Sequence, residues 1–397
     1  MSDALMMEMD PALPERECLT AEERAHATSV WIVAVAGGLM AIGAVMTFSA
    51  STSIDHPLVI WPVWETEAIR QLAFVTTGLV AMLVMTRVPY TWFSLGRGYL
   101  ALVLLVLALG VTTLVFVPGL GVASHGAYRW LKIPGTASRF QPSELVKGAL
   151  PVFLATWTAY RIDVRKFWTG LLPMTIVIGV CAGFIGIEDF GTAALLALVA
   201  GGMLLVAGAK IWHLAFMSLP ALPAFAYLIV SKSHRIDRST IFRDPFQDAA
   251  GKGYQIIQSL CTIISGGWWG RGLGNGFVKG YLPEARNDFI FAVICEELGI
   301  VGAIAVIGLL LTFLWLGRSV VVRCPDPAGR LLAFGIVLMF GAQAAMNIAV
   351  VTASVPTKGI ALPLVSAGGS GTVFLGALVG VLANIARRSG SAPPERA

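Results

Sequence analysis

The hydrophobic pattern of the chain consists of runs of about 20 mostly apolar residues, separated by shorter polar segments. Runs of this length are typical of helices that cross a hydrocarbon core roughly 30 Å thick. No short segments of strict alternation suggest a membrane β-barrel. The pattern therefore predicts ten membrane-spanning helices, at residues 29–50, 68–86, 98–117, 143–160, 169–187, 190–209, 211–230, 289–316, 331–353 and 371–387.

The composition supports the same fold class. Of the 397 residues, 56% are hydrophobic and only 13% are charged, whereas a soluble domain is about 25% charged. We therefore predict an all-α polytopic membrane protein, and we expect no nucleic-acid partner. The five cysteines lie in separate regions, so a metal cluster or disulfide framework is not predicted.

The ends of the chain are polar. Residues 1–28 are acid-rich and lack the basic start and apolar stretch of a signal peptide. We interpret them as a disordered cytoplasmic tail. Residues 29–388 form the predicted membrane domain, and residues 389–397 form a second cytoplasmic tail.

Lysine and arginine are unevenly distributed between the two sides of the predicted bundle. With the N-terminus inside, the cytoplasmic segments hold most of them, whereas the short outer loops hold only Arg129, Lys132, Arg139 and Lys358. Cytoplasmic loops of membrane proteins carry an excess of basic residues. The sequence thus predicts a protein of the cytoplasmic (inner) membrane with both termini in the cytoplasm.

The long outer segment between the seventh and eighth spans, residues 231–288, departs from this charge pattern because it is basic. It is either a solvated loop near anionic headgroups or a cradle for a phosphate-bearing ligand. Within it, Ile256, Ile257, Leu260, Cys261 and Ile264 fall on one helical face, which predicts an amphipathic helix in the interface or against the bundle. The glycines of residues 266–276 allow close backbone approach or tight turns.

Charge is most concentrated where this loop enters the eighth span. Glu284, Arg286 and Asp288 precede the apolar run, and Glu296 and Glu297 follow about two turns inside it. An ionised residue at a helix centre costs roughly 2.5–3.5 kcal/mol on insertion scales. A chain retains such charge where it uses it, so the chemistry is predicted here.

Further polar residues lie at other span edges. Glu144 and Lys147 are three residues apart on one helical face, so they form a structural ion pair or leave Lys147 to bind an anion. Asp189 is suited to cap the sixth span. The proline-broken segment after the ninth span is a candidate cavity lining, with Lys358 as a candidate phosphate contact.

These motifs resemble those of the SEDS family (shape, elongation, division and sporulation proteins), from residue 30 to residue 388. The segments that carry the resemblance are Tyr128–Trp130, Phe140–Lys147, Asp189–Thr192, Leu282–Ala292, Glu296–Gly299, Pro356–Gly359 and Ser366–Ser370. The Pro-Thr-Lys-Gly segment with Lys358 is similar to that of the division branch rather than the elongation branch.

The resemblance implies a ten-helix peptidoglycan glycosyltransferase that polymerises lipid II at the outer membrane face during cell division. Implied partners are a class B penicillin-binding protein (a transpeptidase) and other divisome membrane proteins. It implies Asp288 as the essential catalytic residue. By the predicted topology, the candidate substrate contacts are Arg129, Arg139, Lys147, Glu284, Lys358 and Ser366. The implied supporting residues are Glu144, Asp189, Glu296 and Glu297.

Four positions depart from the family pattern. Arg286-Asn287 stands where His-Thr is usual, Cys295 where Gly is common, Ala367 where Tyr is common, and Glu188 where Pro is usual. The catalytic aspartate position is retained, but Arg286 is expected to alter its pKa or its substrate contacts.

Glycosyl transfer requires a base for the attacking hydroxyl and cations for the departing pyrophosphate. We expect Asp288 to be that base, with a pKa raised by partial desolvation. A divalent cation (Mg or Mn) would share the charge-balancing role, although the acids define no ligand set. The alternatives are a lipid II flippase, an elongation-type polymerase and a scaffold that only recruits the transpeptidase.

Overall fold

The computed structural model describes residues 20–51, 67–124, 127–132, 139–219, 223, 241–242, 244–251 and 253–390, and it is predominantly helical. Its α-helices are α1 (Ala21–Ser51), α2 (Glu67–Arg87), α3 (Tyr99–Thr113), α4 (Ser143–Tyr160), α5 (Leu172–Glu188), α6 (Phe190–Val206), α7 (Ile211–Ser218), α10 (Tyr254–Gly266), α11 (Ile290–Arg323), α12 (Pro327–Val351) and α13 (Ser370–Arg388). Short 3-10 or π turns cover Tyr90–Gly98, Leu114–Phe116, Phe167–Leu171, Pro245–Asp248 and Val278–Tyr281. Nine predicted spans coincide with described helices. The remaining span, 211–230, begins as α7 and then lies mostly outside the described residues.

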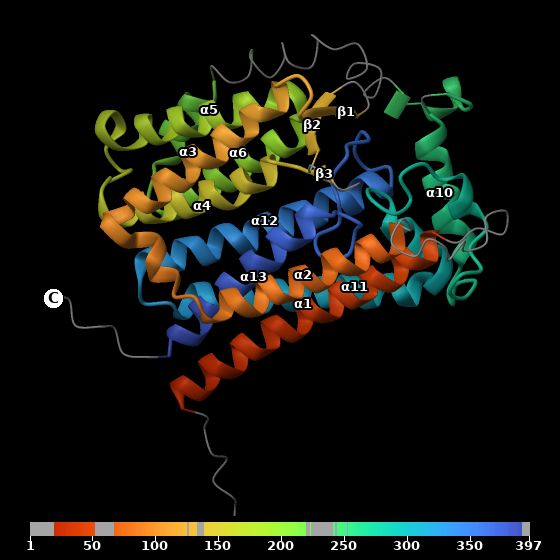
Figure 1. The fold of residues 1–397 in the computed structure, drawn as a ribbon, viewed down its shortest axis with the longest axis horizontal. Helices are drawn as coiled ribbons and strands as arrows, with labels where there is room; N and C mark the ends of the chain where they lie inside the picture. The colour runs from red at the N-terminus through yellow and green to blue at the C-terminus, as the bar shows by residue number, and fades with distance from the viewer. Residues whose placement is uncertain are drawn as a thin grey trace, which may run out of the picture.

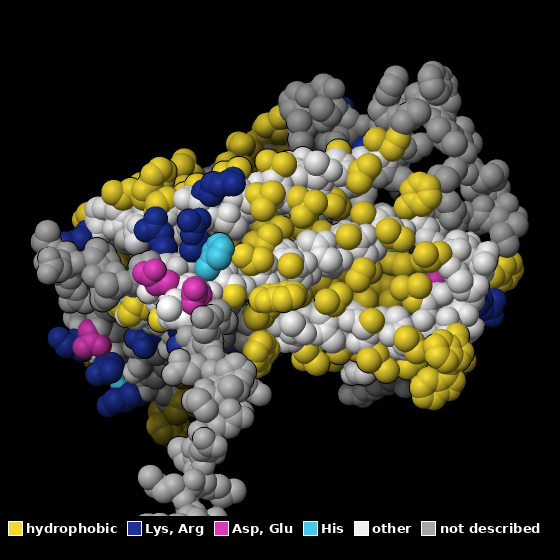
Figure 2. Space-filling model, turned by 90° about the horizontal axis from the view of Figure 1, so that it is seen from below, with side chains coloured by type: hydrophobic (Ala, Val, Ile, Leu, Met, Phe, Trp, Pro, Cys, Tyr) yellow, Lys and Arg dark blue, Asp and Glu magenta, His cyan; other side chains and the backbone are white. Residues whose placement is uncertain are grey.

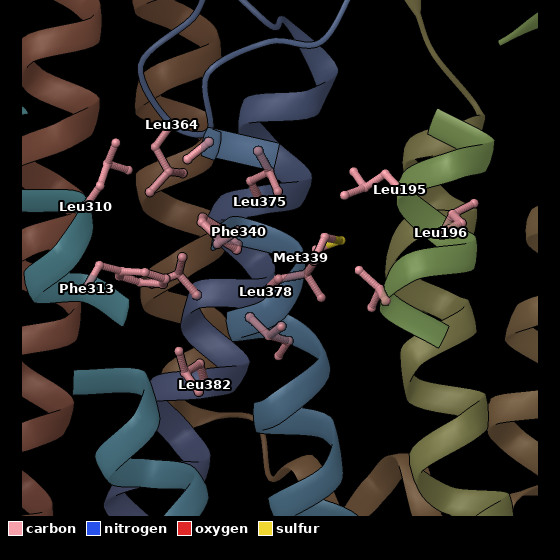
Figure 3. Packing of buried hydrophobic residues seen from close by; sticks show 14 of the residues in the cluster. Leu195, Leu196, Leu310, Phe313, Met339, Phe340, Leu364, Leu375, Leu378 and Leu382 are labelled. Atoms are coloured by element: carbon pink, nitrogen blue, oxygen red, sulfur yellow. The ribbon is translucent and has the colours of Figure 1, made fainter. Parts of the chain in front are cut away.

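The helices form two groups that α12 joins. Figure 1 shows α3, α4, α5 and α6 together on one side and α1, α2, α11 and α13 on the other. Helix α12 packs against α11 in one group and against α4 and α6 in the other. Figure 3 shows buried side chains of α6, α11, α12 and α13 converging, and the Phe313 and Phe340 rings have centroids 4.9 Å apart. The core is therefore continuous across the bundle.

The two ends of the bundle differ in character. The first turn of α1 lies beside the end of α13, where a Cβ on Gly390 would be 2.7 Å from that of Ala25. At the opposite end, which we call the loop end, lie α10 and a small antiparallel sheet (Figure 1). The sheet has the order β1 (Gly121–Ser124), β2 (Ala127–Lys132), β3 (Arg139–Phe140). This sheet was not predicted, because its strands are short.

The surface of the bundle is apolar over its length. Seven described helices are long and apolar enough to cross a membrane, namely α1, α2, α3, α5, α11, α12 and α13. The spans of α3 and α5 include the adjoining 3-10 or π turns, as Tyr90–Phe116 and Phe167–Glu188. Figure 2 shows hydrophobic side chains over the middle of one face and charged side chains gathered mainly at the end where the described chain begins and finishes. Large apolar side chains such as Trp31, Ile304 and Trp315 face outward. The chain is a multi-pass membrane protein of the all-α class.

Helix α1 begins earlier than expected. The prediction of a disordered tail over residues 1–28 is wrong for residues 21–28, which are helical, while residues 1–19 lie outside the described parts. The reason is a capping box: the Thr20 N–H donates to Glu23 Oε2 at 2.7 Å, and the Glu23 N–H donates to Thr20 Oγ1 at 3.2 Å. The acidic residues of this segment therefore start the helix.

Helix α11 is broken at Gly299, whose φ of 67° and ψ of −169° are accessible essentially only to glycine. At this break its backbone pairs with the glycine-rich segment 266–276. The Ile300 N–H donates to Gly267 O at 3.0 Å, and the Arg271 N–H donates to Glu296 O at 2.9 Å. The glycine-rich segment thus has a structural role, the close approach of two backbones.

Helix α10 confirms the predicted amphipathic helix, and its apolar face is only partly buried, at Ile256. Ser259 and Thr262 are buried, and Ser259 Oγ donates to Val351 O at 2.7 Å. Cys261 and Ile264 are exposed. Small polar residues allow close helix packing in a membrane protein, and the apolar face is then left toward lipid.

We expect Gly299→Ala to destabilise the protein by about 3 kcal/mol or more, because alanine is strained at this φ/ψ and its Cβ would overlap the backbone of Gly270 and Trp268. Thermal unfolding in detergent measures the effect. Gly308→Ala is the matched control, since it lies in the same helix with open space around its Cβ position. Equal melting temperatures for the two variants would contradict the structural role of the break.

Candidate active site

Asp288 lies at the loop end, in a turn that leads into α11. Phe289, not Asp288, is the N-cap residue of this helix, and it makes no side-chain cap. Asp288 is therefore not the cap of this helix. The turn is organised by Glu284, which has a φ of 56° and accepts a hydrogen bond from Asn287 Nδ2 at 2.6 Å. Asp288 itself is half-buried.

Helix α12 ties this turn to the broken segment 352–369. Asn347 is completely buried, and its Nδ2 donates to the backbone carbonyls of Asp288 and Ile360, both at 2.7 Å. One turn earlier, Gln343 Nε2 donates to Ala361 O at 2.9 Å. As a result, Gly359 lies against the catalytic candidate: a Cβ there would be 3.1 Å from Asp288 Oδ2.

Lys358, the neighbour of Gly359, faces the start of α6. Its Nζ is 5.0 Å from the centre of the Phe190 ring. Burial lowers the pKa of Lys358 from its usual value, while the negative charge of Asp189 acts in the opposite direction. The lysine therefore stands in a partly desolvated position where a bound anion would interact with it strongly.

Asp189 connects Lys358 to the sheet. It caps α6, as predicted, by accepting from the Thr192 N–H at 3.1 Å, and its Oδ2 is 3.9 Å from Arg129 Nη1. Arg129 Nε donates to Glu188 O at 2.9 Å, and Glu188 Oε2 accepts from the Tyr128 N–H at 2.8 Å. Glu188, an unusual residue for this motif, thus fastens β2 to the end of α5.

These contacts link Asp288, Gly359, Lys358, Asp189 and Arg129, which we call the loop-end site. Beside it lies a cavity with an apolar wall and a charged rim. Its lining includes Val115, Phe116, Phe184, Arg129, Glu188 and Asp189.

Three predicted substrate contacts lie elsewhere. Lys147 Nζ is 2.6 Å from Glu144 Oε1 and both side chains are buried, which confirms the ion pair. Ser366 is buried and its Oγ accepts from the Leu362 N–H at 2.7 Å. Arg139 is exposed on β3, in register with Lys132. Among the described residues, Lys147 and Ser366 bind partners other than Asp288, but the Ala367 N–H, next to Ser366, donates to Arg286 O in the Asp288 turn at 3.0 Å. Glu284 is exposed on the turn itself.

The supporting acids Glu296 and Glu297 are both buried and hydrogen-bonded to the segment 277–279. This arrangement corrects the predicted role of one basic residue in the outer loop 231–288. Lys279 does not contribute to a phosphate cradle, because it is buried and paired with Glu297. Most other basic residues of that loop lie outside the described parts of the chain.

Sequence reasoning missed Gln343 and Asn347. Their signal was present: two amide side chains one helical turn apart within an otherwise apolar span, where polar groups are usually functional. Among the described residues, no group of three or more His, Cys, Asp or Glu side chains has the arrangement of a metal site. A shared divalent cation stays a prediction.

We expect Asn347→Leu to loosen both segments of the loop-end site, since it leaves two buried carbonyls without their donor. The loss of stability should be about 2–3 kcal/mol. Hydrogen exchange should increase in residues 282–289 and 356–366. The matched control is Asn384→Leu, because Asn384 is also buried and joins Tyr90 and Thr86 at the other end of the bundle. Unchanged exchange in both loop-end segments would contradict the role of Asn347.

The chain is similar to known proteins over most of its length. The family model FtsW/RodA/SpoVE, described as "Cell cycle protein", matches residues 28–391. A probable peptidoglycan glycosyltransferase FtsW from Geobacter sp. (strain M18) is 40% identical, over 80% of this chain and 86% of that protein. The FtsW relative from Halomonas elongata is 38% identical over 91% of both chains. Stage V sporulation protein E of Bacillus subtilis is 36% identical, over 88% of this chain and 94% of that protein.

Solved structures support the fold. One similar chain comes from a structure that describes how a peptidoglycan synthase complex coordinates polymerization and crosslinking. Its TM-score is 0.70 at 26% identity, and the match covers 92% of this chain and 98% of that one. The rod shape determining protein RodA of Thermus thermophilus has a TM-score of 0.64 and 25% identity, with 90% and 96% covered. The chain therefore belongs to the FtsW/RodA/SpoVE family of cell cycle proteins.

Proposed function

We propose that the chain is a peptidoglycan glycosyltransferase that polymerises lipid II during cell division, with Asp288 as the general base. One observation carries the assignment to this residue: Asp288 is half-buried and is not the helix cap, its backbone carbonyl is bound by Asn347, and its carboxylate lies against Gly359, the neighbour of Lys358. The FtsW relatives, named as probable peptidoglycan glycosyltransferases, support the reaction class and the division branch.

In this mechanism the acceptor sugar hydroxyl attacks the anomeric carbon of the donor. The new C–O bond forms as the bond to the pyrophosphate breaks, and the hydroxyl proton passes to Asp288. A single base without a second nucleophilic carboxylate fits an inverting displacement. Lys358 and Arg129 balance the charge of the departing pyrophosphate, Lys358 as a point charge and Arg129 through its planar donors.

The surroundings of the site suit a lipid-linked substrate. The small cavity beside Arg129 combines the apolar residues Val115, Phe116 and Phe184 with a charged rim, a mixture of surfaces that suits the junction between a lipid and its phosphates. With both termini cytoplasmic, as the basic residues favour, the loop end faces outward. We propose this orientation in the cytoplasmic (inner) membrane, with a membrane domain from residue 21 to 388, a large outer loop at 231–288 and short cytoplasmic tails.

We also propose a class B penicillin-binding protein as the partner, together with other divisome membrane proteins. The support is the likeness to a chain of a peptidoglycan synthase complex in which polymerization and crosslinking are coordinated. A transpeptidase beside the loop end would receive the glycan strand where it is made.

The alternative function is a flippase for the same lipid, which predicts the same apolar bundle and charged site. Polymerisation in detergent separates the two, because a detergent micelle has no second leaflet. We expect Asp288→Asn to reduce polymer formation from lipid II by about 10²–10⁴-fold, since it removes the base. The full chain is assayed with its transpeptidase partner, and Asp163→Asn, an exposed acid at the opposite end of the bundle, is the control. Normal polymer from Asp288→Asn would overturn the catalytic assignment.

We expect Lys358→Met to lower kcat/KM by about 10- to 150-fold, the equivalent of a charge-assisted hydrogen bond worth about 1.5–3 kcal/mol. The physical reason is the loss of a cation next to the leaving pyrophosphate. Steady-state polymerisation measures it, with Lys210→Met as the control because that lysine is exposed between α6 and α7. An unchanged kcat/KM would exclude Lys358 from pyrophosphate stabilisation.

A further inference from the structure

Two consecutive acids on α11, Glu296 and Glu297, are 0% and 1% exposed, just before the break at Gly299. Glu296 receives three backbone hydrogen bonds. Its Oε1 accepts from the N–H groups of Phe277 and Val278 at 2.9 and 2.8 Å, and its Oε2 accepts from that of Lys279 at 3.0 Å. One carboxylate thus fixes the backbone of the segment that precedes the Asp288 turn.

Glu297 holds the side chain of the same segment. Lys279 Nζ is 2.5 Å from Glu297 Oε1 and also donates to Ser49 O at 2.7 Å. Ser49 Oγ, at the end of α1, donates to Glu297 at 2.6 Å and accepts from the Gly274 N–H at 3.0 Å. Lys279 is 3% exposed and Ser49 6%. We call Lys279, Glu296, Glu297 and Ser49 the buried clamp.

The buried clamp closes a loop around the catalytic candidate. Lys279 and Glu297 are 18 positions apart, and Asp288 lies midway between them. The chain therefore leaves the clamp at Lys279, passes through the turn with Asp288, and returns down the first two turns of α11 to Glu297. The two ends of this loop, Lys279 and Glu297, are therefore joined to each other inside the protein.

A buried ion pair is weak evidence for stability, because well-packed neutral residues of similar size are often as stable. What a pair with fixed hydrogen bonds adds is a unique geometry. For Asp288 geometry is decisive, since a general base must lie within hydrogen-bond reach of the proton that it removes. A displacement of about 1 Å from a distant change can cost 10²-fold in rate.

We propose that Lys279, paired with Glu297, is a positioning residue that sets where the Asp288 carboxylate stands relative to the acceptor hydroxyl. This inference rests on the proposed function. It differs from a purely structural role in one respect: loss of the pair reduces the chemical step even in protein that remains folded.

The test is the double variant Lys279→Met with Glu297→Gln, which removes both charges and leaves neither partner ionised. The full chain with its transpeptidase partner is assayed on lipid II in detergent, and its melting temperature is recorded. We expect kcat to fall about 10- to 100-fold, with KM within about twofold of the parent value, because the pair acts on the reaction and not on binding. Wild-type kcat in the folded double variant overturns the proposal.

The control is Asn384→Leu, which removes a buried polar contact at the opposite end of the bundle. It should lower the melting temperature while leaving kcat per folded enzyme unchanged. If the double variant does not fold, Ser49→Ala is tested in its place. This variant removes one hydroxyl from the buried clamp and leaves Lys279 and Glu297 unchanged. It should lower kcat in the same direction, by less, and an unchanged kcat there overturns the proposal.

Asp288→Asn in the same assay separates this inference from the proposed function. Normal polymer from Asp288→Asn defeats the function and the inference together. Inactive Asp288→Asn with fully active clamp variants defeats the positioning role alone.

Discussion

Buried backbone that is not helical needs hydrogen-bond partners, and the loop end of this protein depends on a few side chains that supply them. Asn347 and Gln343 donate to carbonyls of the segments that carry Asp288 and Lys358. Glu296 accepts from three N–H groups of the segment before the Asp288 turn. Irregular backbone next to an apolar bundle is stable only when it is satisfied in this way. The geometry of the site therefore follows from polar residues on α11 and α12.

The same constraint divides the basic residues by role. Lys147 and Lys279 each lie against a buried glutamate, so their charges are balanced inside the protein. Lys358 and Arg129 instead stand around Asp189, half-buried beside the loop-end cavity. Asp189 is thus the acid that both cations approach, and among the described residues neither cation has a buried glutamate of its own. Sequence position alone does not distinguish the two kinds of lysine.

The helices could be predicted because hydrophobic runs and membrane thickness define them almost completely. Residue types also predicted the Asp189 cap and the Glu144–Lys147 pair, since both are local contacts. Long-range contacts were beyond reach: nothing in the local pattern indicates that Asn347 would meet Asp288, 59 positions away. On α10, Ser259 and Thr262 are buried while Ile264 is exposed, because apolar side chains of a membrane protein need not turn inward.

The break at Gly299 gives α11 two parts with different surroundings. The outer part, from Ile290 to the break, is joined through Glu296 and Glu297 to the segments on either side of the glycine-rich turn and to Ser49 of α1. The inner part packs its apolar side chains, such as Phe313, against α12. A continuous helix would transmit every displacement of the bundle to Asp288. The break separates the two parts, and the bundle contacts this region at two points: Ser49 of α1 binds Lys279 before the Asp288 turn, and Asn347 of α12 binds the turn itself.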